Sequence, residues 1–132
     1  PSIEPVLEEI NNEDTPFVTS EPVDKKVLST LKEVMDDDFV EIIPAYREST
    51  LSIFQGLDEA QLSQDFSVMQ RHAHSLKSSS ANLGALTLSA MAQSMEQQCK
   101  DQIPVEASQL DALKVEFERV DTALENYCAA EI

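Results

Sequence analysis

Apolar residues recur at helical spacing along almost the whole chain from Val23 onward. The clearest stripe lies near the C-terminus and alternates steps of three and four residues: Leu110, Leu113, Phe117, Val120, Leu124 and Tyr127. This spacing turns one face of a helix toward its neighbours and is typical of antiparallel helices joined by short loops. The pattern predicts an all-α fold, an antiparallel four-helix bundle with a short extra N-terminal helix.

Four earlier segments carry similar stripes. A short first helix, with Asp24 as its N-cap, is outlined by Val27, Leu28, Leu31, Val34 and Met35. The second helix follows the acidic triplet at 36–38 and carries Phe39, Ile42, Ile43, Tyr46, Thr50, Ile53, Phe54 and Leu57. Within it, Pro44 is expected to bend the helix or mark its true start, and Gly56 to weaken its end.

The next two stripes complete the bundle. The third reads Leu62, Phe66, Met69, Ala73, Leu76, Ser80 and Leu83 and stops at Gly84. In the fourth helix the predicted inward residues are Leu86, Ala90, Met91, Met95 and Cys99, and Pro104 ends the segment. With only two glycines in 132 residues, a sandwich or barrel, whose tight turns need glycine, is disfavoured.

The beginning of the chain has a different composition. Residues 1–22 hold six acidic residues, four prolines and no basic residue. Prolines interrupt helices, so we expect residues 1–22 to form an acidic, solvated linker and residues 23–132 to form the bundle domain. The sequence does not begin with methionine, and we expect it to be a piece of a longer protein.

Charge and cysteine content limit the kinds of partner and the cellular compartment that we expect for this protein. The formal net charge of −16 disfavours nucleic acid and anionic membrane surfaces as partners. No apolar run is long enough for a membrane span, and no signal peptide opens the chain. The separated Cys99 and Cys128 are typical of a reducing compartment. We therefore expect a cytoplasmic location without direct membrane contact.

One stretch departs from the general acidity. From Phe66 to Met95 there is no Asp or Glu, although the chain's average density predicts about six in such a window. The same window contains Arg71, His72, His74 and Lys77. A surface that lacks carboxylates on so acidic a protein is suited to meeting an anion or an acidic partner.

Helical geometry separates the two histidines of this window. At 100° per residue, His74 lies about 200° from the core residue Leu76 and should face solvent. By the same measure His72 lies within about 40° of Leu76, at the edge of the buried face. Helical metal ligands are spaced at i and i+3 or i+4, so we expect no shared metal site here.

The face around His74 favours phosphoryl chemistry. A neutral exposed imidazole is a good nucleophile and can carry a phosphoryl group reversibly. Lys77, at i+3, can place an ammonium beside the phosphate oxygens. The same face holds Gln70, Arg71, Ser78 and Ala81, the last two small enough to leave the ring accessible. By itself, an exposed histidine with lysine at i+3 also occurs in inert helices.

The run from Ala73 to Ala85, AHSLKSSSANLGA, resembles the motif of histidine-containing phosphotransfer (HPt) domains. The resemblance extends through Asp36–Phe39 and Ile43–Tyr46, covers roughly residues 23–128, and is strongest to the C-terminal HPt domain of a bacterial tripartite hybrid sensor kinase. It implies that His74 is phosphorylated on a ring nitrogen and that Lys77 steadies the phosphate. It also implies that Gly84 lets the third and fourth helices approach closely.

Two positions depart from that motif. Ser78 occupies the position four residues after the histidine, which is frequently glycine in the family, but serine is also small. Glu96 stands at +22, where some members have a glutamine that helps to orient the histidine. A carboxylate can accept a ring N–H and would repel phosphate, so the role of Glu96 stays open at this point.

The resemblance implies a phosphorelay intermediate without autokinase activity. His74 would accept a phosphoryl group from a receiver-domain aspartate of the parent hybrid kinase and pass it to the receiver of a response regulator. The receiver would supply Mg²⁺, so the chain would need no cofactor or metal of its own. We expect a monomer, with residues 1–22 as the tether from a preceding receiver domain.

Three other classes compete with this interpretation. The main alternative is a non-catalytic helical protein-interaction domain, for which His74 would never be phosphorylated. A dimerising kinase histidine domain would require a two-helix hairpin and an ATP-binding domain. A di-metal carboxylate bundle would require paired Glu-x-x-His motifs, which two histidines on opposite faces do not supply.

Overall fold

The computed structural model describes residues 21–131, and in that range every regular element is helical. The elements are α1 (Lys25–Met35), a single 3₁₀ turn η1 (Asp36–Asp38), α2 (Phe39–Ser63), α3 (Phe66–Asn82), α4 (Leu86–Lys100) and α5 (Ala107–Glu131). Residues 1–20, most of the predicted acidic linker, lie outside the described part. Among residues 21–131, no helix combines the length and the apolar character needed to cross a bilayer.

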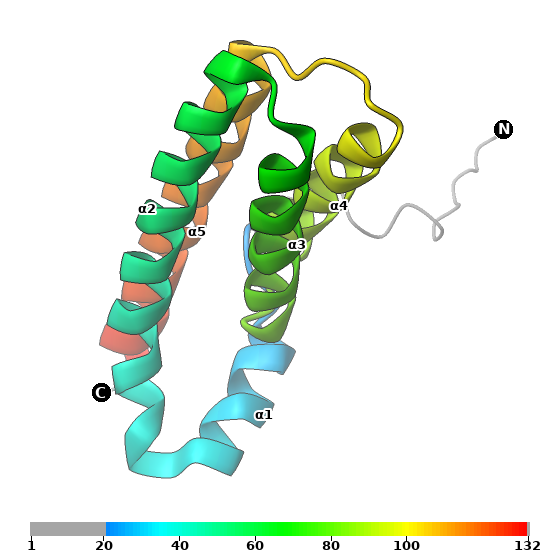
Figure 1. The fold of residues 1–132 in the computed structure, drawn as a ribbon. Helices are drawn as coiled ribbons and strands as arrows, with labels where there is room; N and C mark the ends of the chain where they lie inside the picture. The colour runs from blue at the N-terminus through cyan, green and yellow to red at the C-terminus, as the bar shows by residue number, and fades with distance from the viewer. Residues whose placement is uncertain (1–20, 132) are drawn as a thin grey trace, which may run out of the picture.

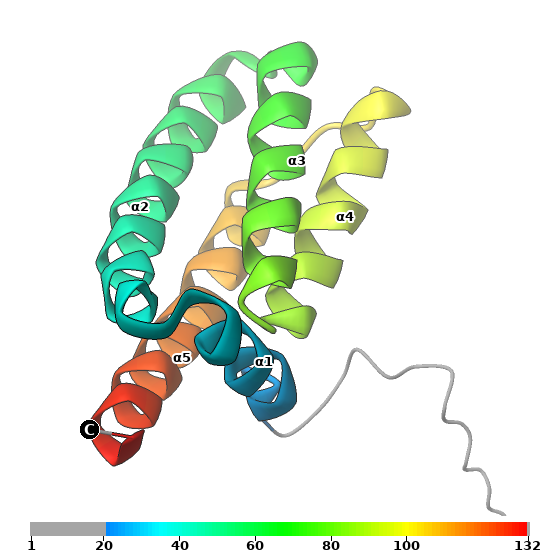
Figure 2. The same ribbon diagram turned by 90° about the horizontal axis from the view of Figure 1, so that it is seen from below.

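Helices α2 to α5 form the predicted four-helix bundle. They alternate in direction, and contacts link α2 with α3, α3 with α4, α4 with α5, and α5 back to α2. The short α1 lies across the end of the bundle where α2 begins and α3 ends (Figures 1 and 2). The predicted fold class, an antiparallel four-helix bundle with a short extra N-terminal helix, is therefore confirmed.

The α5 stripe forms one wall of the core. All six of its predicted inward residues are buried, and its aromatic rings pack against those of α2. Phe117 contacts both Tyr46 and Phe54, with ring centroids 5.9 and 5.7 Å apart. Such tilted and edge-on contacts are favourable arrangements for aromatic pairs. They join the two longest helices, α2 and α5, side by side.

The turn between α3 and α4 is fastened to the start of α1. Asp24 caps α1 as predicted, with its side chain accepting a hydrogen bond from the Lys26 amide. The Asp24 amide in turn donates to the Gly84 carbonyl at 2.8 Å. Gly84 has a φ of 77°, and a Cβ added there would lie 2.8 Å from the Asp24 carbonyl oxygen. Glycine is therefore required at position 84 both by the backbone conformation and by the close approach of α1.

For Pro44 one of the two predicted alternatives is excluded, Gly56 does not end α2, and the assignment of Leu62 is wrong. The helix begins at Phe39 and continues through Pro44, so this proline does not mark its start. It also continues past Gly56 to Ser63, because Phe54, Leu57 and Ala60 remain in the buried stripe. Leu62 belongs to the last turn of α2 and is 84% exposed, so it is not part of the third stripe.

The predicted phase of α4 is correct at Met95 and Cys99, which are buried, and wrong over the first half of the helix. Its buried residues are Leu88, Ala92, Met95, Glu96 and Cys99, whereas Leu86, Ala90 and Met91 are only partly buried. Both sets have helical spacing, and the segment contains several small or polar residues that blur the boundary between faces. The sequence therefore leaves two rotations of this helix nearly equivalent, and packing against α3 selects the one that buries Glu96.

Gly56 has a packing role that the sequence analysis missed. A Cβ at this position would overlap the imidazole ring of His72. His72 is partly buried, and its ring lies against the α2 backbone where only glycine leaves space. The placement of His72 at the edge of the core agrees with its predicted helical phase.

Candidate functional site

Helix α3 presents His74 to solvent while its opposite face is buried. The His74 side chain is 59% exposed, whereas Ala73, Leu76 and Ser80 lie in the core. Asp65 starts the helix by accepting a hydrogen bond from the Val68 amide. Ser80 anchors the other end, because its hydroxyl lies 2.8 Å from that of Tyr46 on α2. The helical phase of the sequence predicts this outward orientation of His74.

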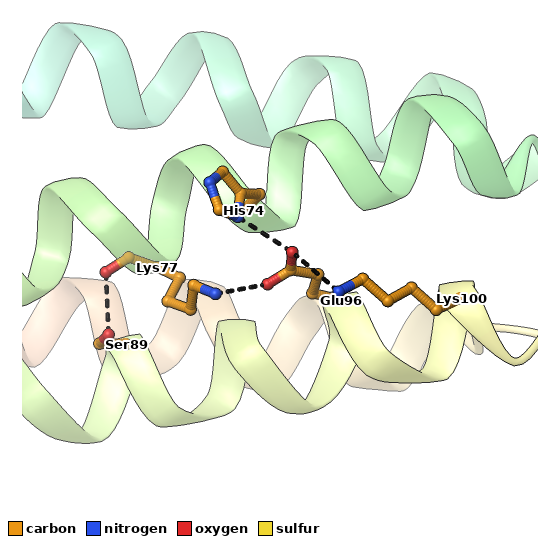
Figure 3. A network of polar contacts seen from close by, with 5 residues as sticks. All are labelled: His74, Lys77, Ser89, Glu96 and Lys100. Atoms are coloured by element: carbon orange, nitrogen blue, oxygen red, sulfur yellow. Dashed lines mark hydrogen bonds and ion pairs between the residues drawn. The ribbon is translucent and has the colours of Figure 1, made fainter.

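A carboxylate from α4 contacts the histidine ring (Figure 3). Nδ1 of His74 lies 2.9 Å from Oε2 of Glu96, and the Lys77 ammonium lies 2.8 Å from Oε1 of the same carboxylate. Lys100, one turn beyond Glu96 on α4, places its ammonium 3.8 Å from Oε2. Only 8% of the Glu96 side chain is exposed. The site is thus a buried carboxylate that joins an exposed imidazole to two lysines.

The surrounding cations keep Glu96 ionised. The Lys77 ammonium, through its hydrogen bond, is the main cause that holds the pKa of Glu96 below its ordinary value of 4.5. Burial acts in the opposite direction, and the hydrogen bond with His74 lowers the pKa further. At neutral pH the carboxylate is therefore charged, and its charge is compensated within the site.

This lowered pKa makes Glu96 a source of pH-dependent stability. A carboxyl group whose pKa is lower in the folded state stabilises the fold above its unfolded pKa, and this contribution is lost as the pH falls through the folded pKa. We expect Glu96→Gln to be less stable than wild type at pH 7, with the difference shrinking as the pH falls below about 4.5. Urea unfolding at pH 7 and about pH 3 measures both variants. A stability difference that is independent of pH would contradict this assignment.

The contact with Glu96 determines which ring nitrogen is available. A carboxylate can only accept hydrogen bonds, so the neutral ring in this contact carries its proton on Nδ1 and donates it to Oε2. The lone pair then resides on Nε2, and Figure 3 shows this second ring nitrogen turned away from the carboxylate. The geometry leaves Nε2 as the ring nitrogen with an available lone pair on an exposed side chain.

The residues that share the His74 face are placed as follows. A shallow pocket beside the ring is lined by Ser67, Gln70, Arg71, His74, Ser75, Glu96 and Lys100. Ser78 and Ala81 are exposed on the same helix, toward its C-terminal end. Gly84 is buried in the turn after α3 and contacts the start of α1, so the structure places it in a packing position and not on the His74 surface.

A second contact between α3 and α4 supports the site. The Ser89 hydroxyl donates to the backbone carbonyl of Lys77 at 2.8 Å (Figure 3). Lys77, whose side chain contacts Glu96, is therefore also held to α4 through its backbone carbonyl. Both links join α3 to α4 on the side where His74 lies.

Sequence reasoning left the role of Glu96 open and missed Lys100. Glu96 is the first acidic residue after the carboxylate-free window, and only the packing of α4 on α3 brings it to the ring. Lys100 follows Glu96 at i+4, a spacing at which Glu and Lys interact on one helix face, and this was the available signal. Among residues 21–131, no group of three or more His, Cys, Asp or Glu is arranged to hold a metal ion.

Comparison with known proteins agrees with this fold and motif. The family model of the Hpt domain matches residues 41–126. The crystal structure of histidine-containing phosphotransfer protein B (HptB) from Pseudomonas aeruginosa PAO1 superposes with a TM-score of 0.78 at 23% identity, covering 83% of this chain and 96% of that one. At this identity the superposition establishes a shared fold. No curated protein matches the chain. The family match shows that the chain belongs to the Hpt domain family, whose role is histidine phosphotransfer in two-component phosphorelays.

Proposed function

We propose that His74 accepts a phosphoryl group on Nε2 from the phosphorylated aspartate of a receiver domain and passes it to the aspartate of a second receiver. The observation that carries this proposal is the contact between Glu96 and Nδ1 of a ring that is 59% exposed. This contact supports Nε2 as the nucleophile and explains the orientation of the ring. An inert surface histidine has no need of a buried carboxylate partner.

The forward step is a displacement at phosphorus. The Nε2 lone pair attacks the phosphorus atom, an N–P bond forms, and the P–O bond of the aspartyl phosphate breaks with its electrons remaining on the aspartate carboxylate. The ring keeps its Nδ1 proton and becomes positively charged. Glu96, which accepts that N–H, then faces a cation, so its stabilising effect grows as the phosphoryl group is bound.

The outward step is the reverse reaction with a different receiver. The second aspartate attacks phosphorus, the N–P bond breaks, and its electron pair returns to Nε2. A ring that remains protonated on Nδ1 is a better leaving group than one that has lost this proton. Glu96 therefore supports both directions of transfer. We propose that the receiver supplies Mg²⁺ and that this chain contributes no metal.

Lys77 is proposed to stabilise the phosphoryl group. For Lys77→Ala we expect phosphotransfer to slow by about tenfold, because an ammonium near the phosphate oxygens is lost. We also expect a loss of about 1–2 kcal/mol in the free energy of unfolding, because Glu96 is buried and loses its closest cation.

Rapid-quench transfer kinetics and urea unfolding measure these two effects. Lys114→Ala is a matched control, since Lys114 forms an ion pair with Asp58 between α5 and α2. Transfer rates equal to those of the Lys114 variant would remove Lys77 from the mechanism.

The proposed function is tested by phosphorylating the full chain. Several isolated receiver domains, loaded on their aspartates with acetyl [³²P]phosphate, serve as donors. We expect label that is acid-labile and alkali-stable, and peptide mapping should assign it to His74. No transfer from any competent donor would instead support the non-catalytic interaction domain. The hybrid-kinase origin, the cytoplasmic location and the monomeric state remain predictions.

A further inference from the structure

Glu96 requires a cation in every state of the site. Its side chain is 8% exposed, and a buried carboxylate without a partner is strongly unfavourable. In the unphosphorylated structure, Lys77 meets this requirement with a contact of 2.8 Å to Oε1. The carboxylate also accepts the hydrogen bond that orients His74, so any loss of its partner would affect the ring directly.

The proposed function makes a second demand on Lys77. The phosphoryl group would be attached to Nε2, which lies across the ring from the nitrogen that contacts Glu96 (Figure 3). We expect the Lys77 ammonium, which lies 2.8 Å from Oε1, to leave the carboxylate when it contacts phosphate oxygens on that far side. Phosphorylation would then draw Lys77 away from Oε1, and Glu96 would keep only the charged ring N–H at Oε2 as a close partner.

Lys100 is positioned to replace Lys77 as the cation beside Glu96. Its ammonium lies 3.8 Å from Oε2, outside hydrogen-bond distance, and its side chain is 48% exposed. Figure 3 shows Lys77 and Lys100 approaching Glu96 from opposite sides. Glu followed by Lys at i+4 is a favourable pair on a helix, so Lys100 needs only a side-chain rotation to close the gap.

We propose that Lys100 is the reserve counter-ion of Glu96: when the phosphoryl group on His74 attracts Lys77, Lys100 closes on the carboxylate and keeps the ring oriented. This inference rests on the proposed function and makes Lys100 a positioning residue that acts through Glu96. Lys100 also lines the pocket beside His74, so direct contact with the phosphoryl group is the competing role that the test must separate.

The test is the phosphoryl equilibrium between one phosphorylated receiver and the full chain, obtained from forward and reverse transfer rates. For Lys100→Gln we expect the phosphohistidine fraction to fall about threefold to fivefold, the range of a partly exposed ion pair. Lys100→Arg should restore the equilibrium. Lys114→Gln, which removes a lysine from a distant ion pair, should leave it unchanged. A merely structural role for Lys100 would lower the melting temperature without moving this equilibrium.

Repeating the Lys100→Gln measurement in a Glu96→Gln variant separates compensation of Glu96 from direct contact with the phosphoryl group. In Glu96→Gln there is no carboxylate to compensate, so Lys100→Gln should have no further effect on the equilibrium. If the full effect persists in that background, Lys100 contacts the phosphoryl group directly and the proposal is wrong. An unchanged equilibrium in Lys100→Gln alone also overturns it. A wild-type chain that accepts no phosphoryl group overturns the proposed function as well, so the two failures are distinguishable.

Discussion

Replacing His74 by glutamine is expected to abolish phosphoryl acceptance while leaving the bundle folded. Glutamine has no nucleophilic ring nitrogen, but its amide can still donate a hydrogen bond toward Glu96. The ring is 59% exposed, and Lys77 continues to compensate the carboxylate. We therefore expect loss of more than about 1,000-fold in phosphohistidine formation, with a change in melting temperature of at most about 2 °C.

His72→Gln is the matched control for this variant. His72 packs against Gly56 and has no place in the proposed chemistry, so its replacement should lower stability and retain phosphoryl acceptance. Scintillation counting of labelled protein and thermal unfolding by circular dichroism measure the two properties. Label that persists in His74→Gln would move the site to another residue. Extensive unfolding of the same variant would contradict the exposed placement of His74.

The largest expected loss of stability comes from Gly84→Ala. The backbone at this residue has a φ of 77°, and the new Cβ would lie 2.8 Å from the Asp24 carbonyl oxygen. A backbone carbonyl cannot move aside without displacing the start of α1. We expect a loss of about 2 kcal/mol and a decrease in melting temperature of about 10 °C.

Gly84→Asn separates the two causes of this loss. Asparagine tolerates the left-handed conformation better than alanine does, but it has the same Cβ. If steric contact with Asp24 dominates, both variants should be destabilised to a similar extent. If backbone conformation dominates, the asparagine variant should be the more stable one. A Gly84→Ala variant that melts like wild type would contradict both arguments.

Much of the fold follows from the sequence because the apolar spacing is regular. The stripe from Leu110 to Tyr127 is buried at all six positions, and Asp24 caps α1 as its position predicts. Where the spacing is ambiguous, the prediction was wrong. In α4 two rotations satisfy the pattern, and Leu62 continued a stripe across a helix boundary. One-dimensional spacing cannot resolve such cases, because they depend on which neighbour a helix packs against.

The candidate site also combines one feature that the sequence predicts with one that it does not. The orientation of His74 follows from its phase relative to Leu76 within a single helix. The contact with Glu96 depends on the rotation and register of α4 relative to α3, which the sequence alone leaves open. The source of the site's carboxylate is hidden from the sequence for the same reason. A surface that lacks carboxylates over thirty residues of sequence receives one from the residue immediately after that window.

The pair of links between α3 and α4, from Ser89 to Lys77 and from Glu96 to His74, has a consequence for repeated use of the site. A mobile imidazole would lose rotamer entropy each time a partner bound, at about 0.5–1.5 kcal/mol for an ordered side chain. A relay intermediate meets two partners in each cycle and would lose that entropy at both encounters. Here the ring is ordered when the chain folds, so neither encounter has to restrain it again.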